Sequence, residues 1–552
     1  MLSTPTRARL VIPGVALSLA LAACSGGSGG SASPEPSEGT GSFSVYIGEP
    51  ENPLVPGNTN ETEGGQIVDS LWTGLITYNP ETTEVEYDGV AESIESGDSR
   101  TWTITLKDGW TFHDGTPVTA KSYVDAWNYT AYSPNTQGNS YFFSNVEGYE
   151  ALQGETDDAG NVVTQPAAKE MSGLRAVDDK TVEVTLAEPF AQYPVTLGYT
   201  AFFPLPEAFY ADPEGFGQQP VGNGPFRATA PLDPTRGMTV TRYEEYAGEN
   251  PAQAQEVEFR IYTEDNVAYN DVLAGNLDVV DIIPPDAIAT APQQFGDRFV
   301  ERPSGDITSL GFPNFDPRYS DPRVKQAISL AIDRQAITEA IFLGSRRPVG
   351  SWIAPTIDGY REDACEFIDF DPARADQLLD QAGFDRTKPV ELWFNAGAGH
   401  EEWMQAVGNQ LRENLGLEFV LRGDLQFPQY LPLGDAKGFT GPHRAGWIMD
   451  YPSPQNFLEP LYGTEALPPA GSNNFWYSNP EFDALVQQGN SAPDNETAIG
   501  FYHQAEDLLC RDMPSAPLFS RVNQTVHSER VEGAYTNAFG RVPVAEIRVV
   551  QE

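Results

Sequence analysis

The run Leu106–Trp127 constrains the fold more than any other segment, because it combines a strand end, two tight turns and a helix start. Gly109 and Gly115 each follow an aspartate, and such Asp-Gly pairs tolerate the positive φ that tight turns require. Thr119 has the side chain of a good N-cap, and two aromatic residues then follow four apart on one helical face. The segment therefore predicts a strand that turns twice and leads directly into a capped helix.

Strands and helices alternate along the sequence. Residues 257–262 predict a strand, a helix follows, and residues 275–280 predict a second strand, so the three form a βαβ unit. Asp321 and Asp371 each precede a proline, which is typical of an N-cap followed by the first helical residue. The alternation favours an α/β fold in which helices cover a mixed sheet. Further strands are expected at 44–48, 101–106, 180–186, 238–243, 392–394 and 417–421, and further helices at 66–75, 121–150, 371–383 and 401–415.

The first 24 residues have the pattern of an export signal. Two arginines precede an apolar stretch at 10–20, which is too short to span a bilayer because that takes about 20 apolar residues. Leu21–Cys24 then resembles a bacterial lipobox, so Cys24 is expected to carry a lipid; an ordinary secretory signal that contains a cysteine is the alternative. Residues 25–42 are rich in Ser, Gly and Pro and predict a flexible tether with a mean reach of about 20–25 Å.

The charge balance excludes several classes of partner. With 79 acidic residues against 33 Lys and Arg, the net charge of −46 repels phosphate backbones and anionic lipid heads. We therefore expect no nucleic-acid partner, and contact with the bilayer only through the N-terminal lipid.

The five histidines lack metal-ligand spacing, and no P-loop, HExxH motif or nucleophile elbow occurs outside the tether. The sequence thus predicts neither a metal, a cofactor nor an enzyme.

Two further cysteines, Cys365 and Cys510, lie far apart in the sequence. In an exported chain a disulfide between them is permitted, and closing so long a loop would contribute about 4 kcal/mol in the chain-entropy model. Two separately buried thiols are the alternative, because the sequence does not give the distance between them.

Seven segments of the chain together resemble a known family: Leu71–Tyr78, Leu106–Trp127, Leu273–Asp278, Asp321–Arg334, Asp371–Gly383, Tyr477–Phe482 and Pro514–Leu518. They fall in the order found in the extracytoplasmic solute-binding proteins of family 5, which serve peptide, nickel and opine ABC importers, and the chain is most similar to the oligopeptide-binding branch of that family. The resemblance implies an α/β, two-lobed periplasmic-binding-protein-like fold of type II, in the large three-subdomain variant, with mixed sheets and a hinge.

The same resemblance implies where the lobes begin and end. Lobe I is expected to comprise 43–283 together with a returning C-terminal tail at 517–552. It would carry an inserted subdomain at about 83–200. Lobe II is expected at 284–516.

The segment Arg444–Tyr451 is the candidate ligand site. It is an apolar run interrupted by Arg444 and Asp450, and burying unpaired charges is costly. Either the two side chains pair with each other or with neighbours, or the strand ends at a cleft and offers its charge to a ligand.

In the oligopeptide-binding branch, the matching aspartate receives the α-ammonium group of the peptide. The resemblance thus assigns the N-terminus of a peptide to Asp450, main-chain pairing to Gly446 and Ile448, and a wall of the site to Trp447. Arg444 either holds a carboxylate or orients Asp450.

The opposite lobe is expected to contribute contacts as well. The loop at 58–61, through Asn60 and Glu61, and the aromatic run at 141–143, through Tyr141, lie where relatives touch their ligands. Aromatic residues are more often part of a core, which is the alternative for Tyr141.

These features together predict a monomeric lipoprotein on the outer face of a bacterial cell membrane. It would capture oligopeptides or dipeptides and deliver them to the permease subunits of an ABC importer by closure of its lobes. Three alternatives stay open at this point: the same fold binding a nickel chelate, a sugar or an opine; a lipid-anchored hydrolase; and a binding protein used in signalling or adhesion.

Overall fold

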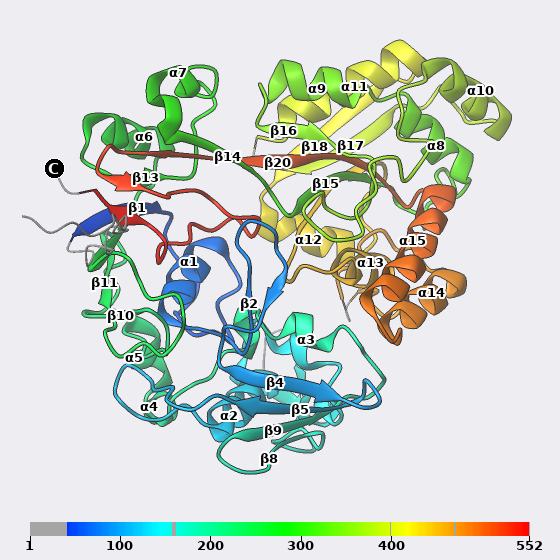
Figure 1. Ribbon diagram of the computed structural model, residues 1–552. Coiled ribbons are helices and arrows are strands. Elements are labelled where there is room, and N and C mark those ends of the chain that lie inside the picture. The colour runs from blue at the N-terminus through cyan, green and yellow to red at the C-terminus, as the bar shows by residue number, and fades with distance from the viewer. Residues whose placement is uncertain (1–40, 157–161, 398, 469–470, 551–552) are drawn as a thin grey trace, which may run out of the picture. The chain divides into compact units, whose positions relative to one another are not determined.

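The computed structural model describes residues 41–156, 162–397, 399–468 and 471–550 (Figure 1). The predicted export signal at 1–24, the lipidation of Cys24 and the predicted tether up to residue 40 lie outside the described residues. None of the described helices has the length and apolar character needed to cross a membrane.

Twelve strands of the described chain form one mixed sheet. Its order is β10-β11-β12-β1-β13-β20-β15-β19-β17-β18, and β14 and β16 also pair with β20. The bounds of these strands are β1 Ser42–Ile47, β10 Phe226–Ala228, β11 Gly237–Arg242, β12 Glu256–Ile261, β13 Val279–Val280, β14 Phe299–Pro303, β15 Asp306–Gly311, β16 Arg346–Pro348, β17 Val390–Asn395, β18 Phe419–Leu425, β19 His443–Ile448 and β20 Ser515–His527.

The predicted βαβ unit is present as β12, α6 (Asp265–Ala274) and β13. Both strands run parallel to β1, which lies between them, so the first described strand is central rather than at an edge. β1 begins at Ser42, the last residue of the range predicted for the tether. The helix α6 ends at Gly275, whose φ of 75° is the left-handed conformation that glycine adopts at no steric cost.

The long strand β20 takes part in both halves of the sheet (Figure 1). Its first residues pair with β15 and β16, and its last residues pair with β14 and β13. Nearly every residue along it is buried. The lobe boundary predicted at residue 517 falls inside this strand, so one element of the backbone connects the two halves.

A separate antiparallel sheet lies within the range predicted for the inserted subdomain. Its order is β4-β5-β9-β8. Its strands are β4 Ala91–Ser96, β5 Thr101–Leu106, β8 Leu174–Ala176 and β9 Thr181–Thr185, and short two-stranded ladders elsewhere join β2 Thr77–Tyr78 with β3 Val85–Glu86, β6 Glu155–Thr156 with β7 Val162–Thr164, and β21 Val531–Glu532 with β22 Arg548–Val549.

The helix α2 (Ala120–Ala131) begins after Thr119, as predicted. The backbone N–H of Thr119 donates to Ser122 Oγ at 3.2 Å, and Gly109 and Gly115 have φ of 88° and 83°. Trp127 is fully buried, and its indole N–H donates to the carbonyl oxygen of Phe202 at 3.0 Å. The turns and the cap thus fix where the helix starts, and burial of its aromatic face fixes how it packs.

The remaining helices cover the sheets. In the first half of the chain and its inserted region they are α1 Thr62–Leu71, α3 Tyr193–Thr196, α4 Glu207–Ala211, α5 Pro213–Gln218 and α7 Ala291–Phe295, with 3₁₀ turns at Ser133–Asn135, Ser140–Phe143, Tyr149–Leu152, Thr200–Phe202 and Gly296–Arg298. In the second half they are α8 Pro322–Leu330, α9 Arg334–Ile341, α10 Pro372–Ala382, α11 Glu401–Leu415, α12 Phe427–Asp435, α13 Gln455–Tyr462, α14 Pro480–Asn490 and α15 Asn495–Asp512.

Several predicted boundaries are exact and others are wrong. α8 and α10 begin at the predicted Asp-Pro pairs, and α11 has the predicted bounds. The helix predicted at 66–75 instead spans Thr62–Leu71, because Gly74 and Leu75 accept backbone hydrogen bonds from Val90 and Ala91. The helix predicted at 121–150 is α-helical only to Ala131 and continues as separate 3₁₀ turns.

Two large hydrophobic clusters divide the described chain. One joins residues of 43–279 to residues of 531–547, and the other joins residues of 310–519. The C-terminal segment therefore packs against the N-terminal half.

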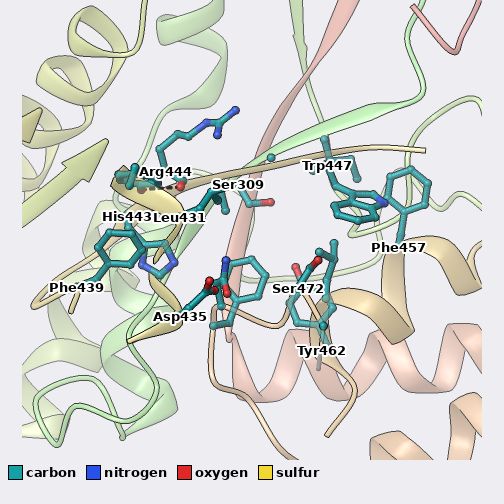
Figure 2. A pocket seen from close by; sticks show the side chains of 18 of the residues that line it. Ser309, Leu431, Asp435, Phe439, His443, Arg444, Trp447, Phe457, Tyr462 and Ser472 are labelled. Carbon is teal, nitrogen blue, oxygen red and sulfur yellow. Dashed lines mark hydrogen bonds between the residues drawn. The ribbon is translucent and has the colours of Figure 1, made fainter. Parts of the chain in front are cut away.

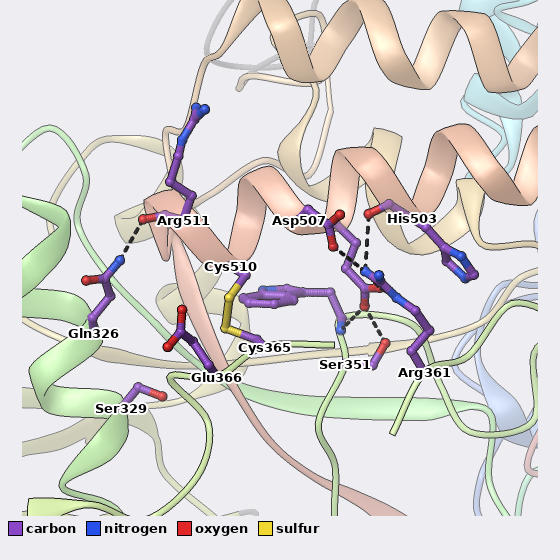
Figure 3. The surroundings of a disulfide bond; sticks show 12 residues. Gln326, Ser329, Ser351, Arg361, Cys365, Glu366, His503, Asp507, Cys510 and Arg511 are labelled. Atoms are coloured by element: carbon purple, nitrogen blue, oxygen red, sulfur yellow. Dashed lines mark hydrogen bonds and ion pairs between the residues drawn. A yellow bond between two sulfur atoms is a disulfide. The ribbon is translucent and has the colours of Figure 1, made fainter. Parts of the chain in front are cut away.

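A disulfide joins Cys365 to Cys510, so the predicted pairing is present, with the two Cα atoms 5.3 Å apart (Figure 3). Nearby, Arg361 pairs at 2.6 Å with the fully buried carboxylate of Glu506. Both contacts fasten α15 to the segment that precedes α10.

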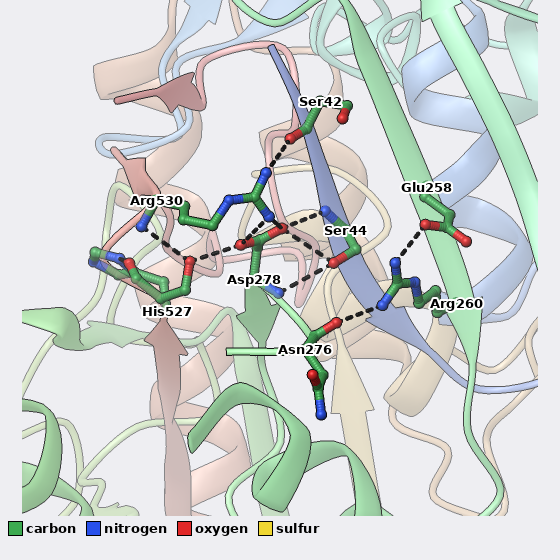
Figure 4. A network of polar contacts seen from close by, with 9 residues as sticks. Ser42, Ser44, Glu258, Arg260, Asn276, Asp278, His527 and Arg530 are labelled. Carbon is green, nitrogen blue, oxygen red and sulfur yellow. Dashed lines mark hydrogen bonds and ion pairs between the residues drawn. The ribbon is translucent and has the colours of Figure 1, made fainter. Parts of the chain in front are cut away.

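The buried carboxylate of Asp278 joins three segments that are distant in sequence (Figure 4). It accepts hydrogen bonds from the backbone N–H of Ser44 at 3.0 Å and from the hydroxyl of Ser528 at 2.7 Å. Arg530 donates to both of its oxygens at 3.1 and 3.0 Å. This one side chain thus holds the first strand, β13 and the segment after β20 together.

Removing the disulfide should lower stability. Because the crosslink spans 145 residues, the double variant Cys365→Ala/Cys510→Ala should lose about 2–5 kcal/mol of unfolding free energy, measured by urea denaturation. Wild-type protein treated with reductant is the control and should lose a similar amount. Identical midpoints for oxidised and reduced wild type would contradict this prediction.

Removing the Asp278 carboxylate should also destabilise the fold. Asp278→Ala leaves Arg530 and two hydroxyls without their shared acceptor, which should cost about 2–4 kcal/mol of unfolding free energy. The exposed Asp286→Ala is the matched control and should change it by less than about 0.5 kcal/mol. Thermal denaturation of the three proteins checks this, and equal effects of both variants would speak against it.

Candidate functional site

A cavity of about 1050 Å³, called here the large cavity, lies beside Asp450. Asp450 and Ile448 line it together with Asn60, although the sequence separates them by almost 400 residues. The wall gathers residues of 60–88, 198–203, 225–253, 302, 448–450 and 533–548. Segments that the sequence analysis assigned to different lobes therefore meet at one cavity.

Asp450 is held in place by the buried amide of Asn456. The backbone N–H of Asp450 donates to Asn456 Oδ1 at 2.9 Å, and Asn456 Nδ2 donates to Asp450 Oδ2 at 3.0 Å. The indole N–H of Trp447 donates to the same Asn456 Oδ1 at 3.1 Å. Asn456 lies in the first turn of α13 and is not among the site residues predicted from the sequence. Its only signal in the sequence is an amide one turn beyond the charged strand end.

The carboxyl group of Asp450 is partly withdrawn from water. Burial raises its pKa to about 6, and the hydrogen bond from Asn456 and the charge of Arg541 oppose that rise. Arg541 itself forms an ion pair with Asp69 at 2.5 Å. In the described part of the chain, Asp450 has no ion-pair partner within 4 Å, so its charge is available at the cavity wall.

Tyrosines surround this carboxylate. Burial raises the pKa of Tyr78, Tyr141, Tyr199 and Tyr451, and the negative charge of Asp450 raises it further in all four. Their hydroxyls are thus neutral at physiological pH, and the site combines one carboxylate with aromatic rings. Both features favour a cation.

The predicted site residues divide between two cavities. Asp450, Ile448 and Asn60 line the large cavity, whereas Arg444, Gly446 and Trp447 line a second cavity of about 320 Å³ (Figure 2). Glu61 and Tyr141 line neither.

The carboxylate of Glu61 is turned toward the preceding loop. Its Oε1 accepts from the backbone N–H groups of Glu51 at 3.0 Å and Asn52 at 3.4 Å. Tyr141 lies near enough to Asp450 to feel its charge, and its ring contacts Phe142 with 4.3 Å between centroids.

The second cavity is walled by aromatic rings, which include Phe427, Tyr430, Phe439, Trp447, Phe457, Tyr462 and Phe475. His443 is 2% exposed and stacks between Phe439 and Phe475, with centroid distances of 4.6 and 5.9 Å. Burial lowers the pKa of His443 to about 3, so the imidazole is neutral. This histidine is not among the site residues predicted from the sequence, because a single histidine in an apolar strand carries no spacing signal.

Arg444 lies in a cluster of cationic side chains and makes no ion pair or hydrogen bond with Asp450 in the described structure. Burial lowers the pKa of Arg444 and of Arg346, and the positive charge of Arg521 lowers both further. The charge of Arg444 also lowers the pKa of Arg346. Of these three arginines, Arg521 alone has an ion-pair partner in the described chain, Asp306 at 3.2 Å. Figure 2 shows the Arg444 side chain pointing away from His443 and Phe439.

β19 and the two residues that follow it therefore present two opposite charges in one short segment, Arg444 within the strand and Asp450 beyond its end. Arg444 and Asp450 are six residues apart, so their Cα atoms are separated by at most about 20 Å. No group of three or more His, Cys, Asp or Glu side chains arranged to hold a metal ion occurs among the described residues. The arrangement can bind a ligand that is positive at one end and negative at the other.

Comparisons with known proteins identify similar sequences and a matching family model. A family model described as bacterial extracellular solute-binding proteins, family 5 Middle, matches residues 87–467. The oligopeptide-binding protein OppA of Bacillus subtilis (strain 168) is 25% identical and covers 95% of this chain and 96% of that protein. The periplasmic murein peptide-binding protein MppA of Escherichia coli (strain K12) is also 25% identical, with 83% of each chain covered.

Solved structures share the fold. The unliganded open form of the murein tripeptide-binding protein MppA superposes with a TM-score of 0.76 at 23% identity, over 93% of this chain and 98% of that one. Haemophilus influenzae OppA in complex with the peptide RPPGFSPFR gives a TM-score of 0.71 at 20% identity, over 92% and 99%.

Neutralising Asp450 should stabilise the ligand-free protein at alkaline pH. Its pKa is raised in the folded state, so folding favours the protonated acid, and stability is lost as pH rises through about 6. Asp450→Asn should therefore add up to about 2–3 kcal/mol of unfolding free energy at about pH 8 and almost none at about pH 4. The exposed Asp424→Asn should show no such pH dependence, and urea denaturation at both pH values checks the pair. If Asp450→Asn raised the unfolding free energy by the same amount at both pH values, this electrostatic account would be ruled out.

Proposed function

Because the chain belongs to the bacterial extracellular solute-binding proteins of family 5, whose model matches residues 87–467, we propose that it captures short peptides outside the cell membrane and delivers them to an ABC permease. Its α/β fold is the two-lobed fold of periplasmic binding proteins, with mixed sheets. Relatives named for oligopeptide, dipeptide and murein peptide binding support a peptide as the ligand.

The observation that carries the proposal is the Asp450 carboxylate at the wall of the large cavity. Asn456 fixes its orientation, and no cation of the described chain pairs with it. A peptide ammonium group would supply the missing positive charge and replace water lost on burial. Every peptide with a free N-terminus carries this group, so such a contact fixes register without selecting sequence.

The free edge of β19 supports main-chain recognition. β19 pairs along its whole length with β15, whereas on the other edge only His443 pairs with a described strand, β17. The carbonyl of Arg444 accepts from the Tyr430 hydroxyl at 2.8 Å on that second edge. Because backbone groups two residues apart point the same way, Gly446 and Ile448 offer theirs on this edge, where an extended peptide can add as a strand.

The cationic cluster supports a role for Arg444 at the other end of the ligand. The buried Nε atoms of Arg444 and Arg346 have no hydrogen-bond partner among the described residues. A peptide carboxylate would satisfy them and relieve repulsion among the arginines. Arg444 is therefore assigned to a carboxylate in this proposal rather than to orienting Asp450, the role that Asn456 has.

The lobes and the anchor complete the proposal. Lobe I at 43–283 and 517–552 and lobe II at 284–516 would close on a peptide that contacts both, with β20 crossing between them. Cys24 would carry the lipid, and 25–42 the tether, of a monomer held at the outer face of the membrane.

Asp450→Asn should weaken the binding of peptides with a free N-terminal amine but not of N-acetylated peptides. For peptides with a free amine, the variant should bind about 100-fold more weakly than wild type in calorimetry, because a buried charge-assisted contact is lost. N-acetylated versions should bind wild type and variant with equal, weak affinity.

Asp424→Asn is the matched control and should leave every affinity unchanged. Wild type that binds acetylated and free peptides equally well would refute the carboxylate–ammonium contact. Failure of all peptides to bind would refute peptide capture itself.

A further inference from the structure

The large cavity carries more negative charge than a peptide N-terminus can neutralise. We propose that it selects peptides with positively charged side chains, an inference that rests on the peptide capture proposed above.

Ionised side chains on the wall are mostly acidic. The carboxylates are Asp69, Glu81, Glu86, Asp88, Glu249, Asp450 and Glu546, and the cations are Arg302, Arg541 and Arg548.

All three arginines are already paired. Arg541 binds Asp69 at 2.5 Å, Arg302 approaches Glu81 at 3.6 Å, and Arg548 approaches Glu532, which lies outside the wall, at 3.5 Å. Within the described structure, the other five wall carboxylates have no ion-pair partner. The wall therefore has a surplus of negative charge that only a ligand or solvent can balance.

Neutral donors hold several of these carboxylates in place. Glu86 accepts from Asn79 Nδ2 at 2.9 Å, and Asp88 accepts from Asn250 Nδ2 at 3.0 Å. Glu546 accepts from the hydroxyl of Tyr535 at 3.0 Å. These contacts fix the oxygens but leave the charge intact, which suits a site that recognises a cation.

The carboxylates also repel one another. Burial raises the pKa of Glu546, and the charges of Glu81 and Glu86 raise it further, although the Tyr535 hydrogen bond opposes the rise. Glu249 is exposed and has no hydrogen-bond or ion-pair partner in the described chain. A lysine or arginine side chain in the cavity would relieve this repulsion.

The concave shape strengthens the preference. A cleft lined by one sign of charge focuses the field, and each exposed charge alone would contribute little. Asp450 meets the α-ammonium group that all peptides share, so it does not discriminate between side chains. Glu86, Asp88, Glu249 and Glu546 are the groups left to do so.

The test compares pentapeptides whose three central residues are all Lys, all Gln or all Glu, with Ala at both ends. Wild-type protein should bind the Lys peptide about tenfold more tightly than the Gln peptide at low ionic strength, and the Glu peptide most weakly. In about 1 M NaCl the ratio should fall several-fold, because salt screens exposed charges. Isothermal titration calorimetry gives each dissociation constant.

A triple variant tests where the preference arises. Glu86→Gln/Glu249→Gln/Glu546→Gln keeps shape and hydrogen-bond acceptors, and should reduce the Lys-to-Gln ratio to about two or three while the Gln peptide still binds. The matched control, Glu402→Gln/Glu413→Gln/Glu418→Gln, removes the same charge from exposed positions outside the wall and should leave the ratio unchanged.

The outcomes separate this inference from peptide capture. Equal dissociation constants for the three peptides overturn the selection and leave capture standing. An equal loss of preference in both triple variants also overturns it, because the preference would then reflect net charge alone. Binding of none of the peptides overturns capture and, with it, the selection.

Discussion

The strand β20 is the element on which the rest of the structure depends. It pairs with β15 and β16 over its first residues and with β14 and β13 over its last, so both halves of the sheet share one backbone. Beyond its end, Ser528 and Arg530 bind the buried carboxylate of Asp278, which also receives Ser44. N-terminal and C-terminal segments of the described chain also meet at the wall of one cavity.

In the proposed function, one strand and its end serve three kinds of recognition. β19 carries Arg444 near its start, offers backbone groups along its free edge and leads to Asp450 just beyond its end. The charges stay apart because Asn456 holds Asp450 while Arg444 lies among other arginines. An extended zwitterion matches this order of groups, which is why the proposed ligand follows from the strand rather than from a motif of isolated residues.

Charge acts at two scales in this molecule. The net charge of −46 determines which macromolecules are repelled, but it does not select a ligand. The proposed selection of cationic peptides depends on which wall carboxylates have no ion-pair partner. At the large cavity the three wall arginines are already paired, and the concave wall concentrates the field of the carboxylates that have no ion-pair partner in the described chain.

The sequence by itself determined what depends on neighbouring residues: the turns at Gly109 and Gly115, the caps of α2, α8 and α10, the βαβ unit and the charged strand that ends near Asp450. It could not determine what depends on distant segments. The end of α1 is set by pairing of Gly74 and Leu75 with residues 90–91, and the partner of Asp450 is Asn456 rather than Arg444. The crosslink between Cys365 and Cys510 and the unpaired carboxylates of the cavity also required the folded chain, because distance and pairing exist only once these segments are packed together.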